Sequence, residues 1–282
     1  MFRDGPAGLL QRQQRIAIGK ASLGSDRSEA PSNVGGVCGA LAGGCFHAAE
    51  LELSTGPATG RRTVLDRDTL FVDPSSAEHR SRYQEALRSR QRALDLNGVD
   101  SSELGPYEHI CAEHGARLTE ARARAAGVLI PALLSAFKAI AAPELLLDAQ
   151  YVAGGSDDVA TAREELAKRR VVDRARGSAS FGPHRDDLSL VLDGHPARVV
   201  ASQGQHRAIT MSIKLAELRA IAAASGKFPL LLLDDISSEL DRDRMIALLA
   251  AVTEPGGQVI ITTTRPELIE TPECCLPIAV MW

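Results

Sequence analysis

The feature that most constrains the fold of this chain is a run of four leucines that ends at two carboxylates. Leu230–Leu233 follow a proline, and Asp234 and Asp235 come directly after them. A short apolar run without alternation is typical of a strand buried on both faces, as in a parallel sheet. Ligands of open α/β sheets bind at the carboxyl ends of such strands, where two acids can hold Mg²⁺ on a nucleotide. The alternative is a buried strand followed by a solvated acidic turn.

Two further motifs flank this strand in the order found in ABC-type ATPases. Ser238-Glu239-Leu240-Asp241 matches the D-loop that follows a Walker B strand, and Ser202-Gln203-Gly204-Gln205 upstream matches the signature motif. The signature opens a segment whose apolar residues recur at helical spacing. Ser202 is a suitable helix N-cap, and Gly204 lets a phosphate approach the backbone where amides and helix dipole favour an anion. Together the three motifs predict an ATP-binding surface.

Further segments make the chain resemble the RecF family, the bacterial recombination mediators with an ABC-type, SMC-like ATPase head. Residues 181–188 read Phe-Gly-Pro-His-Arg-Asp-Asp-Leu, and residues 257–264 read Gly-Gln-Val-Ile-Ile-Thr-Thr-Thr. Residues 61–66 resemble the family's Arg-Arg-x-Phe-Leu-Asp segment. The resemblance runs from about residue 50 to residue 264 and is densest after 181.

The resemblance implies an α/β fold, an ABC/SMC-type P-loop NTPase head with an inserted helical, coiled-coil-like arm. We expect residues 1–73 to be a remnant of the N-terminal part of the head, 74–177 the arm, and 178–282 the C-terminal lobe. Helical spacing around 83–94 and 106–140, broken at Asn97-Gly98, predicts two long helices in the arm.

Smaller elements are also expected. Leu65–Asp73 is interpreted as a transition into the arm, and Pro131 is expected to kink or split the second long helix. A third helix is predicted from Asp157 to about Val172. Residues 188–200 are expected to form a hairpin that turns at Asp193-Gly194.

The resemblance also implies roles for the motif residues. Two heads bind ATP between them, so that the signature of one meets the P-loop of the other. Asp234 would hold Mg²⁺, and Asp235 stands where ABC enzymes place a catalytic carboxylate. The interface residues would be Ser202, Gly204 and Gln205 on the γ-phosphate, with Ser238 and Asp241 bracing the dimer.

The P-loop itself, G-x-x-x-x-G-K-[ST], does not occur in the sequence. Gly19-Lys20 is followed by alanine and Gly226-Lys227 by phenylalanine, and neither pair has a glycine five positions earlier. The amides and lysine of that loop cradle the β- and γ-phosphates. We therefore expect an N-terminally truncated or decayed copy with little ATPase activity of its own, and whether the chain is an enzyme stays open.

Charge patterning gives a second candidate surface. The net charge of −4 neither supports nor excludes a nucleic-acid partner, because a local patch decides that. Residues 77–94 hold five arginines against two acids, and residues 163–176 hold six basic residues against three acids. Arg88, Arg90 and Arg92 are therefore candidate phosphate contacts. The alternative is an ordinary solvated helix face.

The five cysteines form no C-x-x-C pair, and no stretch of about 18 uninterrupted apolar residues or basic-then-apolar leader is found. We expect a cytoplasmic protein without a membrane partner. The first interpretation is a RecF-like repair and recombination-mediator protein that binds DNA at gaps, stalled forks and single-strand/double-strand junctions. It would work as an ATP-dependent dimer with other mediator proteins. The alternatives are a non-catalytic subunit or DNA-binding interaction protein that supplies only a signature face, and accidental motifs on an unrelated α/β protein.

Overall fold

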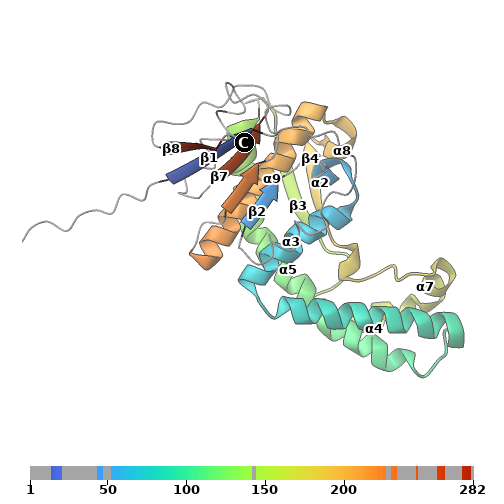
Figure 1. Cartoon of the computed structure of the whole chain (residues 1–282). Helices are drawn as coiled ribbons and strands as arrows, with labels where there is room; N and C mark the ends of the chain where they lie inside the picture. The colour runs from blue at the N-terminus through green and yellow to red at the C-terminus, as the bar shows by residue number, and fades with distance from the viewer. Residues whose placement is uncertain are drawn as a thin grey trace, which may run out of the picture. The chain divides into compact units, whose positions relative to one another are not determined.

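The computed structural model describes residues 14–20, 43–46, 52–141, 144–226, 230–233, 246, 259–263 and 275–280. The chain, drawn in Figure 1, consists of two compact units, each with more contacts within it than to the other. One unit comprises residues 1–48 and 228–282, and the other comprises residues 49–227. The finer division into head and arm at residues 73 and 177 stays a prediction.

The first unit contains a five-stranded sheet in the order β2-β6-β7-β1-β8. Every pairing in it is parallel, and Leu232 lies opposite Ile260 in the central register. The prediction that the four leucines form a strand of a parallel sheet is therefore confirmed. The strands are β1 (Gln14–Lys20), β2 (Gly43–Phe46), β6 (Leu230–Leu233), β7 (Val259–Thr263) and β8 (Cys275–Val280).

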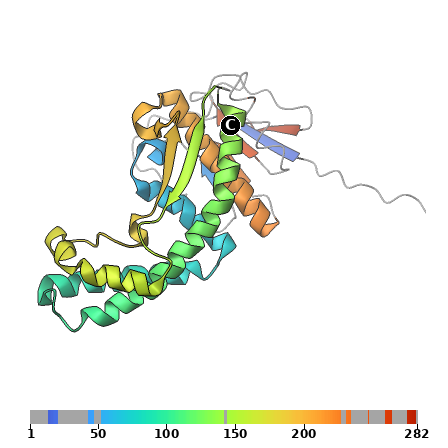
Figure 2. The ribbon, with the colours of Figure 1, turned by 180° about the vertical axis from the view of Figure 1, so that it is seen from behind.

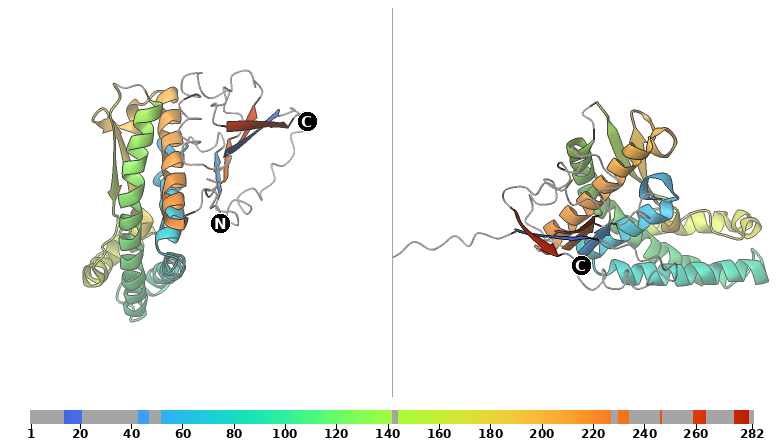
Figure 3. Two further views of the ribbon diagram at one scale, coloured as in Figure 1. Left: turned by 90° about the vertical axis from the view of Figure 1, so that its left-hand side faces the viewer. Right: turned by 45° about the horizontal axis from the view of Figure 1, so that its top comes forward.

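The second unit is built around one long helix, α5, which packs against α3, α4, α6 and α9 (Figure 2). Figure 3 shows α5 and α9 running beside each other. The helices are α2 (Glu52–Thr55), α3 (Ala58–Val72), α4 (Ser76–Asn97), α5 (Leu104–Ile140), α6 (Val159–Lys168), α7 (Arg170–Arg176), α8 (Ala197–Val200) and α9 (Gln203–Ser225), with the 3₁₀ turn η2 (Pro183–Arg185).

A small antiparallel sheet, β3-β4-β5, completes this unit. It consists of β3 (Leu147–Val152), β4 (Asp187–Leu192) and β5 (His195–Pro196). Burial alternates along β4, so that its three leucines face the interior. The predicted turn at Asp193-Gly194 is present, with both residues at positive φ as a two-residue hairpin requires. The second arm of the hairpin is shorter than predicted, because α8 begins at Ala197.

The core of the second unit lies between the helices. By length and composition α5 could cross a membrane, but its apolar residues Leu129, Leu133 and Phe137 are fully or almost fully buried. Buried residues of α9, such as Ile209 and Ile213, come from the helix that packs beside it. One helix of this length and composition is weak evidence for a membrane span, because a buried core helix passes the same test.

Two predictions about the helices were wrong in detail. Leu65–Asp73 is not a transition but the C-terminal half of α3 and its cap. The buried face of α3 carries Arg61, Asp68 and Thr69 as well as Val64 and Leu65, so it shows no apolar periodicity. The third helix is divided at Arg169 into α6 and α7. Of the two outcomes predicted for Pro131, a split is absent because α5 continues through it, and a kink stays a prediction.

Candidate functional site

The signature residues form the capped first turn of α9, as predicted from the sequence. The Gln205 amide donates to Ser202 Oγ at 3.3 Å, and the Ser202 amide donates to Gln205 Oε1 at 2.7 Å. This reciprocal pair is a capping box, which holds the first turn of the helix against fraying. The sequence folds this way because serine and glutamine occupy the N-cap and N3 positions of a 23-residue helix.

The capping box leaves a set of hydrogen-bond donors at the turn. Ser202 Oγ acts as an acceptor, so its own O–H proton stays available, and Gln205 Nε2 points away from the cap because Oε1 occupies it. In the part of the chain that the structure describes, no acceptor is bonded to the amides of Gln203 and Gly204. Ser202 and Gln203 are exposed. These donors at the positive end of a helix dipole suit a phosphate.

A buried histidine fixes this turn to helix α2. A hydrogen bond of 2.7 Å joins His206 Nδ1 to Ser54 Oγ of α2, and both side chains are buried. Burial lowers the pKa of His206, so the imidazole stays neutral near pH 7. This histidine therefore has a structural role in holding α2 against the signature turn.

Farther along α9, a charged cluster joins the helix to α3. Arg67 of α3 donates two hydrogen bonds to the Glu217 carboxylate, which also accepts one from Lys214. Asp68, the next residue of α3, is 2% exposed and neither of its carboxyl oxygens has a hydrogen-bond partner. Burial, with the Glu217 charge as a second cause, raises the pKa of Asp68 to about 8. Asp68 is consequently a neutral acid at pH 7.

The Arg-Arg segment of α3 contacts the Gly-Pro-His-Arg-Asp-Asp segment. Arg61 donates two hydrogen bonds to the Asp187 carboxylate, at 2.8 and 3.0 Å. Arg62 donates to the backbone carbonyl of Asp186 at 2.7 Å. Two motifs that are far apart in the sequence are thus joined by a charge-assisted, bidentate pair.

Arg122 of α5 is the centre of a larger buried network. Its guanidinium donates to Asp66 of α3 and to Asp186, and the arginine is 4% exposed. Asp186 also accepts from the Tyr151 hydroxyl at 2.6 Å and from the Gly154 amide at 2.8 Å. The buried charges of this network are paired and hydrogen-bonded, which is the condition under which burial of charges is tolerated.

Gly182 is required where the same segment crosses α4. Its φ is +133°, and a Cβ at this position would lie 2.1 Å from the Tyr83 hydroxyl oxygen. That hydroxyl is hydrogen-bonded to His184 Nδ1 at 2.7 Å, and His184 Nε2 bonds the Ala179 carbonyl. Since Nε2–H must donate to the carbonyl, the tyrosine donates to Nδ1. Burial lowers the pKa of His184, which keeps this arrangement neutral.

The acidic half of the predicted site lies outside the described residues. Asp234, Asp235, Ser238 and Asp241 all follow the last described residue of β6. Their assignment to Mg²⁺, catalysis and the D-loop stays a prediction.

The structure corrects one of the three predicted DNA contacts. Arg90 is 0% exposed and donates to the carboxylates of Glu108 and Asp173 and to the Leu166 carbonyl. A buried, paired guanidinium cannot reach a phosphate. Arg88 and Arg92 are exposed, and no ion pair joins either of them to a residue that the structure describes. Helical spacing alone could have distinguished the buried Arg90 from the exposed Arg88 and Arg92, since positions 86, 90 and 93–94 lie on one buried face of α4.

The parallel sheet with a capped signature turn on a long helix, together with the helices α4–α7, defines a portion of an ABC-type ATPase head with an inserted helical arm. The DNA replication and repair protein RecF of Anaeromyxobacter sp. (strain Fw109-5) is 37% identical over 279 residues, covering 95% of this chain and 74% of that protein. The RecF protein of Myxococcus xanthus (strain DK1622) is 37% identical over 233 residues, covering 78% of this chain and 61% of that protein. The chain belongs to the RecF family.

A solved structure of the recombination mediator protein RecF with ATP agrees with this assignment. It matches with a TM-score of 0.69 and 27% sequence identity, over 80% of this chain and 62% of that one. The fold predicted from the sequence, an ABC/SMC-type head with an inserted arm, is thereby confirmed. The chain spans between 61 and 74% of the lengths of these relatives. No family model matches the chain.

Proposed function

We propose that this chain supplies the signature face of a RecF-type, ATP-dependent dimer that acts on DNA in replication, repair and recombination. The solved relative is named a recombination mediator in the RecFOR pathway and was determined with ATP. The corresponding ligand here is the γ-phosphate of an ATP held by the opposite head. The chain would act in the cytoplasm at gaps, stalled forks or single-strand/double-strand junctions, with other mediator proteins as partners.

The observation that carries this proposal is the set of donors at the first turn of α9. The Ser202 hydroxyl proton, the Gly204 amide and Gln205 Nε2 are all donors without a partner inside the capping box. A γ-phosphate offers acceptors only, so donors of this kind are complementary to it. In the same proposal Asp234 holds Mg²⁺, Asp235 is the catalytic carboxylate, and Ser238 and Asp241 brace the dimer.

The experiment is assembly in trans. The chain is mixed with full-length Myxococcus xanthus RecF that carries a hydrolysis-blocking substitution in its own acidic pair, and the mixture is sedimented with ATP or with ADP. We expect a heterodimer with ATP and separate species with ADP. Ser202→Arg is expected to abolish the ATP-dependent species, because a long cation takes the place of the hydroxyl that meets the phosphate.

Ser81→Arg is the matched control, since Ser81 is exposed on α4 and makes none of the hydrogen bonds of the capping box. This variant is expected to assemble like the wild type. Equal association with both nucleotides, or none with either, would show that the signature turn does not recognise a nucleotide in trans.

A second candidate function rests on the sequence, which contains no P-loop motif. The chain would then be a non-catalytic subunit that lends its signature face and hydrolyses no ATP alone. Turnover measured with Mg²⁺ and ATP, with and without duplex DNA, separates the two. A DNA-stimulated rate that Asp235→Asn abolishes excludes the non-catalytic alternative.

A further inference from the structure

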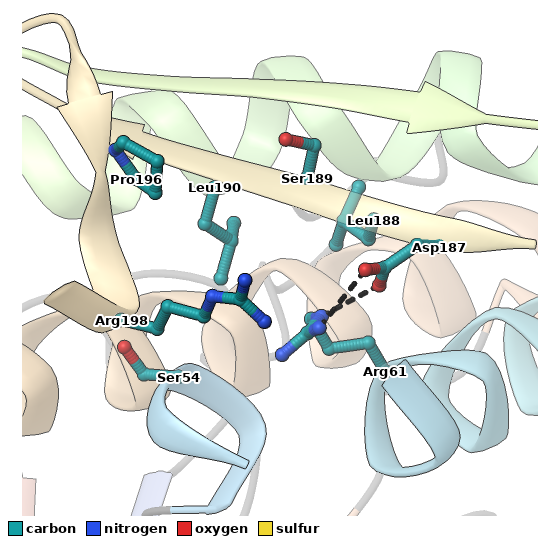
Figure 4. A pocket seen from close by; sticks show the side chains of 8 residues that line it. All are labelled: Ser54, Arg61, Asp187, Leu188, Ser189, Leu190, Pro196 and Arg198. Atoms are coloured by element: carbon teal, nitrogen blue, oxygen red, sulfur yellow. Dashed lines mark hydrogen bonds and ion pairs between the residues drawn. The ribbon is translucent and has the colours of Figure 1, made fainter. Parts of the chain in front are cut away.

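A pocket of about 260 Å³ lies beside the signature helix, between β4 and the helices α2, α3 and α8 (Figure 4). In Figure 4 the side chains of Leu188 and Leu190 point from β4 toward the guanidinium groups of Arg61 and Arg198. The pocket is lined by Ser54, Arg61, Asp187, Leu188, Ser189, Leu190, Pro196 and Arg198.

The two arginines of the pocket differ in their pairing. Arg61 is 6% exposed, its Nε and Nη2 donate to the Asp187 carboxylate, and its Nη1 donates to the carbonyls of Leu53 and Gly56. Its charge is therefore balanced within the protein. Arg198 is exposed, and no hydrogen bond or ion pair joins it to any residue of the described chain. The lining thus presents one uncompensated positive charge, carried by a planar group with five donors.

The rest of the lining limits which anion fits. The accessible apolar surface of the pocket comes from Pro196, which is exposed, and from the edge of Leu190, which is 8% exposed, while Leu188 lies buried behind them. Asp187 contributes a negative charge at the same pocket. A dianionic phosphate would face one free cation and one carboxylate, whereas a monoanion balances the single free charge. Guanidinium groups bind carboxylates through two parallel hydrogen bonds, and an apolar wall favours carbon atoms next to the charged group.

We propose that this pocket binds a carboxylate attached to a short, branched apolar body. Arg198 pairs with the carboxylate, and the apolar body lies against Pro196 and the edge of Leu190. Such a group occurs on a small organic acid and at the C-terminus of a peptide that ends in leucine. The volume of about 260 Å³ accommodates one such group.

The pocket has a direct connection to the signature turn. Ser54 lines the pocket, and its Oγ is hydrogen-bonded to His206 in the first turn of α9. A ligand that bonds to the Ser54 hydroxyl changes the environment of the His206 ring. An effect of the ligand on dimerisation rests on the proposed function, whereas binding to the pocket does not.

The test is a titration of the full chain, without nucleotide, by calorimetry and by NMR. The probes are 4-methylpentanoate, its uncharged analogue 4-methylpentanamide, the peptide acetyl-Gly-Gly-Leu with a free carboxylate, and inorganic phosphate. We expect a carboxylate probe to bind with a Kd of about 1 mM, as suits a ligand of eight heavy atoms. The amide is expected to bind at least ~10-fold more weakly. Tighter binding of the peptide identifies a protein C-terminus as the source, and tighter binding of the acid identifies a small metabolite.

Arg198→Gln is expected to weaken carboxylate binding at least ~10-fold, and its circular dichroism should match that of the wild type because the side chain is exposed. Arg163→Gln, an exposed arginine of α6 outside the lining, is the matched control and should bind like the wild type. Equal binding of acid and amide, equal or tighter binding of phosphate, or an unchanged Kd for Arg198→Gln would overturn the proposal. An unshifted His206 ring resonance at saturation would overturn only the connection to the signature turn.

Discussion

Replacing Asp68 by asparagine should stabilise the protein at neutral pH and leave it little changed below about pH 4. Asp68 is 2% exposed on α3, and neither carboxyl oxygen has a hydrogen-bond partner. Burial and then the Glu217 charge raise its pKa to about 8, while Arg67 and Lys214 oppose that shift only in part. The ionised form is therefore strongly disfavoured in the folded state.

The magnitude follows from proton linkage. An unfolded aspartate has a pKa of about 3.9, so between about pH 4 and pH 8 the folded state binds the Asp68 proton more tightly than the unfolded state does. The stability that this proton provides is complete below pH 4 and is lost as the pH rises to 8. The loss is about 1.4 kcal/mol per pH unit, or about 3 kcal/mol between pH 5 and pH 7.5. Asparagine does not titrate, so Asp68→Asn should remove this slope.

The assay is urea unfolding of wild type and Asp68→Asn at several pH values between 5 and 7.5, followed by circular dichroism. We expect the difference in unfolding free energy to grow in favour of the variant as the pH rises. Asp73→Asn is the control, because the Ser75 hydroxyl lowers the Asp73 pKa and its titration lies below this window. A difference between wild type and Asp68→Asn that is independent of pH would refute the reasoning.

Two further predictions separate buried from exposed arginines on α4. Arg90→Met should lower the unfolding free energy by about 3–5 kcal/mol, because it leaves the buried carboxylate of Asp173 without its guanidinium. Arg92→Met should stay within about 0.5 kcal/mol of wild type in the same urea-unfolding assay. The binding of duplex DNA should weaken as the salt concentration rises. The double variant Arg88→Ala, Arg92→Ala should flatten the slope of the logarithm of the binding constant against the logarithm of salt concentration, by about 0.9 for each phosphate contact that is lost. Affinity that is insensitive to both salt and these arginines would exclude α4 as the DNA-binding surface.

Elements with a local signal could be predicted from the sequence. The strand Leu230–Leu233 has an apolar run without alternation, as is typical of parallel sheets, and the signature turn has a serine and a glutamine at the two positions of a capping box. The two-residue turn at Asp193-Gly194 depends on residues that tolerate positive φ. In each case the residues that determine the structure are neighbours in the chain.

The rest could not be predicted because its causes are distant in the sequence. α3 buries Arg61 and Asp68 on the face that an amphipathic helix fills with apolar residues. Arg61 is acceptable there only because Asp187 lies beside it, 126 positions along the chain. Helical spacing places Arg90 on the buried face of α4, but its partner Asp173 lies 83 positions away and could not be predicted. Charge alone does not reveal burial when the partner belongs to another element.

Consecutive residues of α3 join the arm helices to the signature helix. Asp66 accepts hydrogen bonds from Arg122 of α5 and Arg80 of α4, and Arg67 pairs with Glu217 of α9. Because adjacent residues on a helix are separated by about 100°, these two positions face different neighbours. α3 therefore links α4 and α5 to α9 through ion pairs on two of its faces, beside the direct packing of α5 against α9. In this chain Asp66 and Arg67 of α3 therefore connect three other helices of the same unit, α4, α5 and α9.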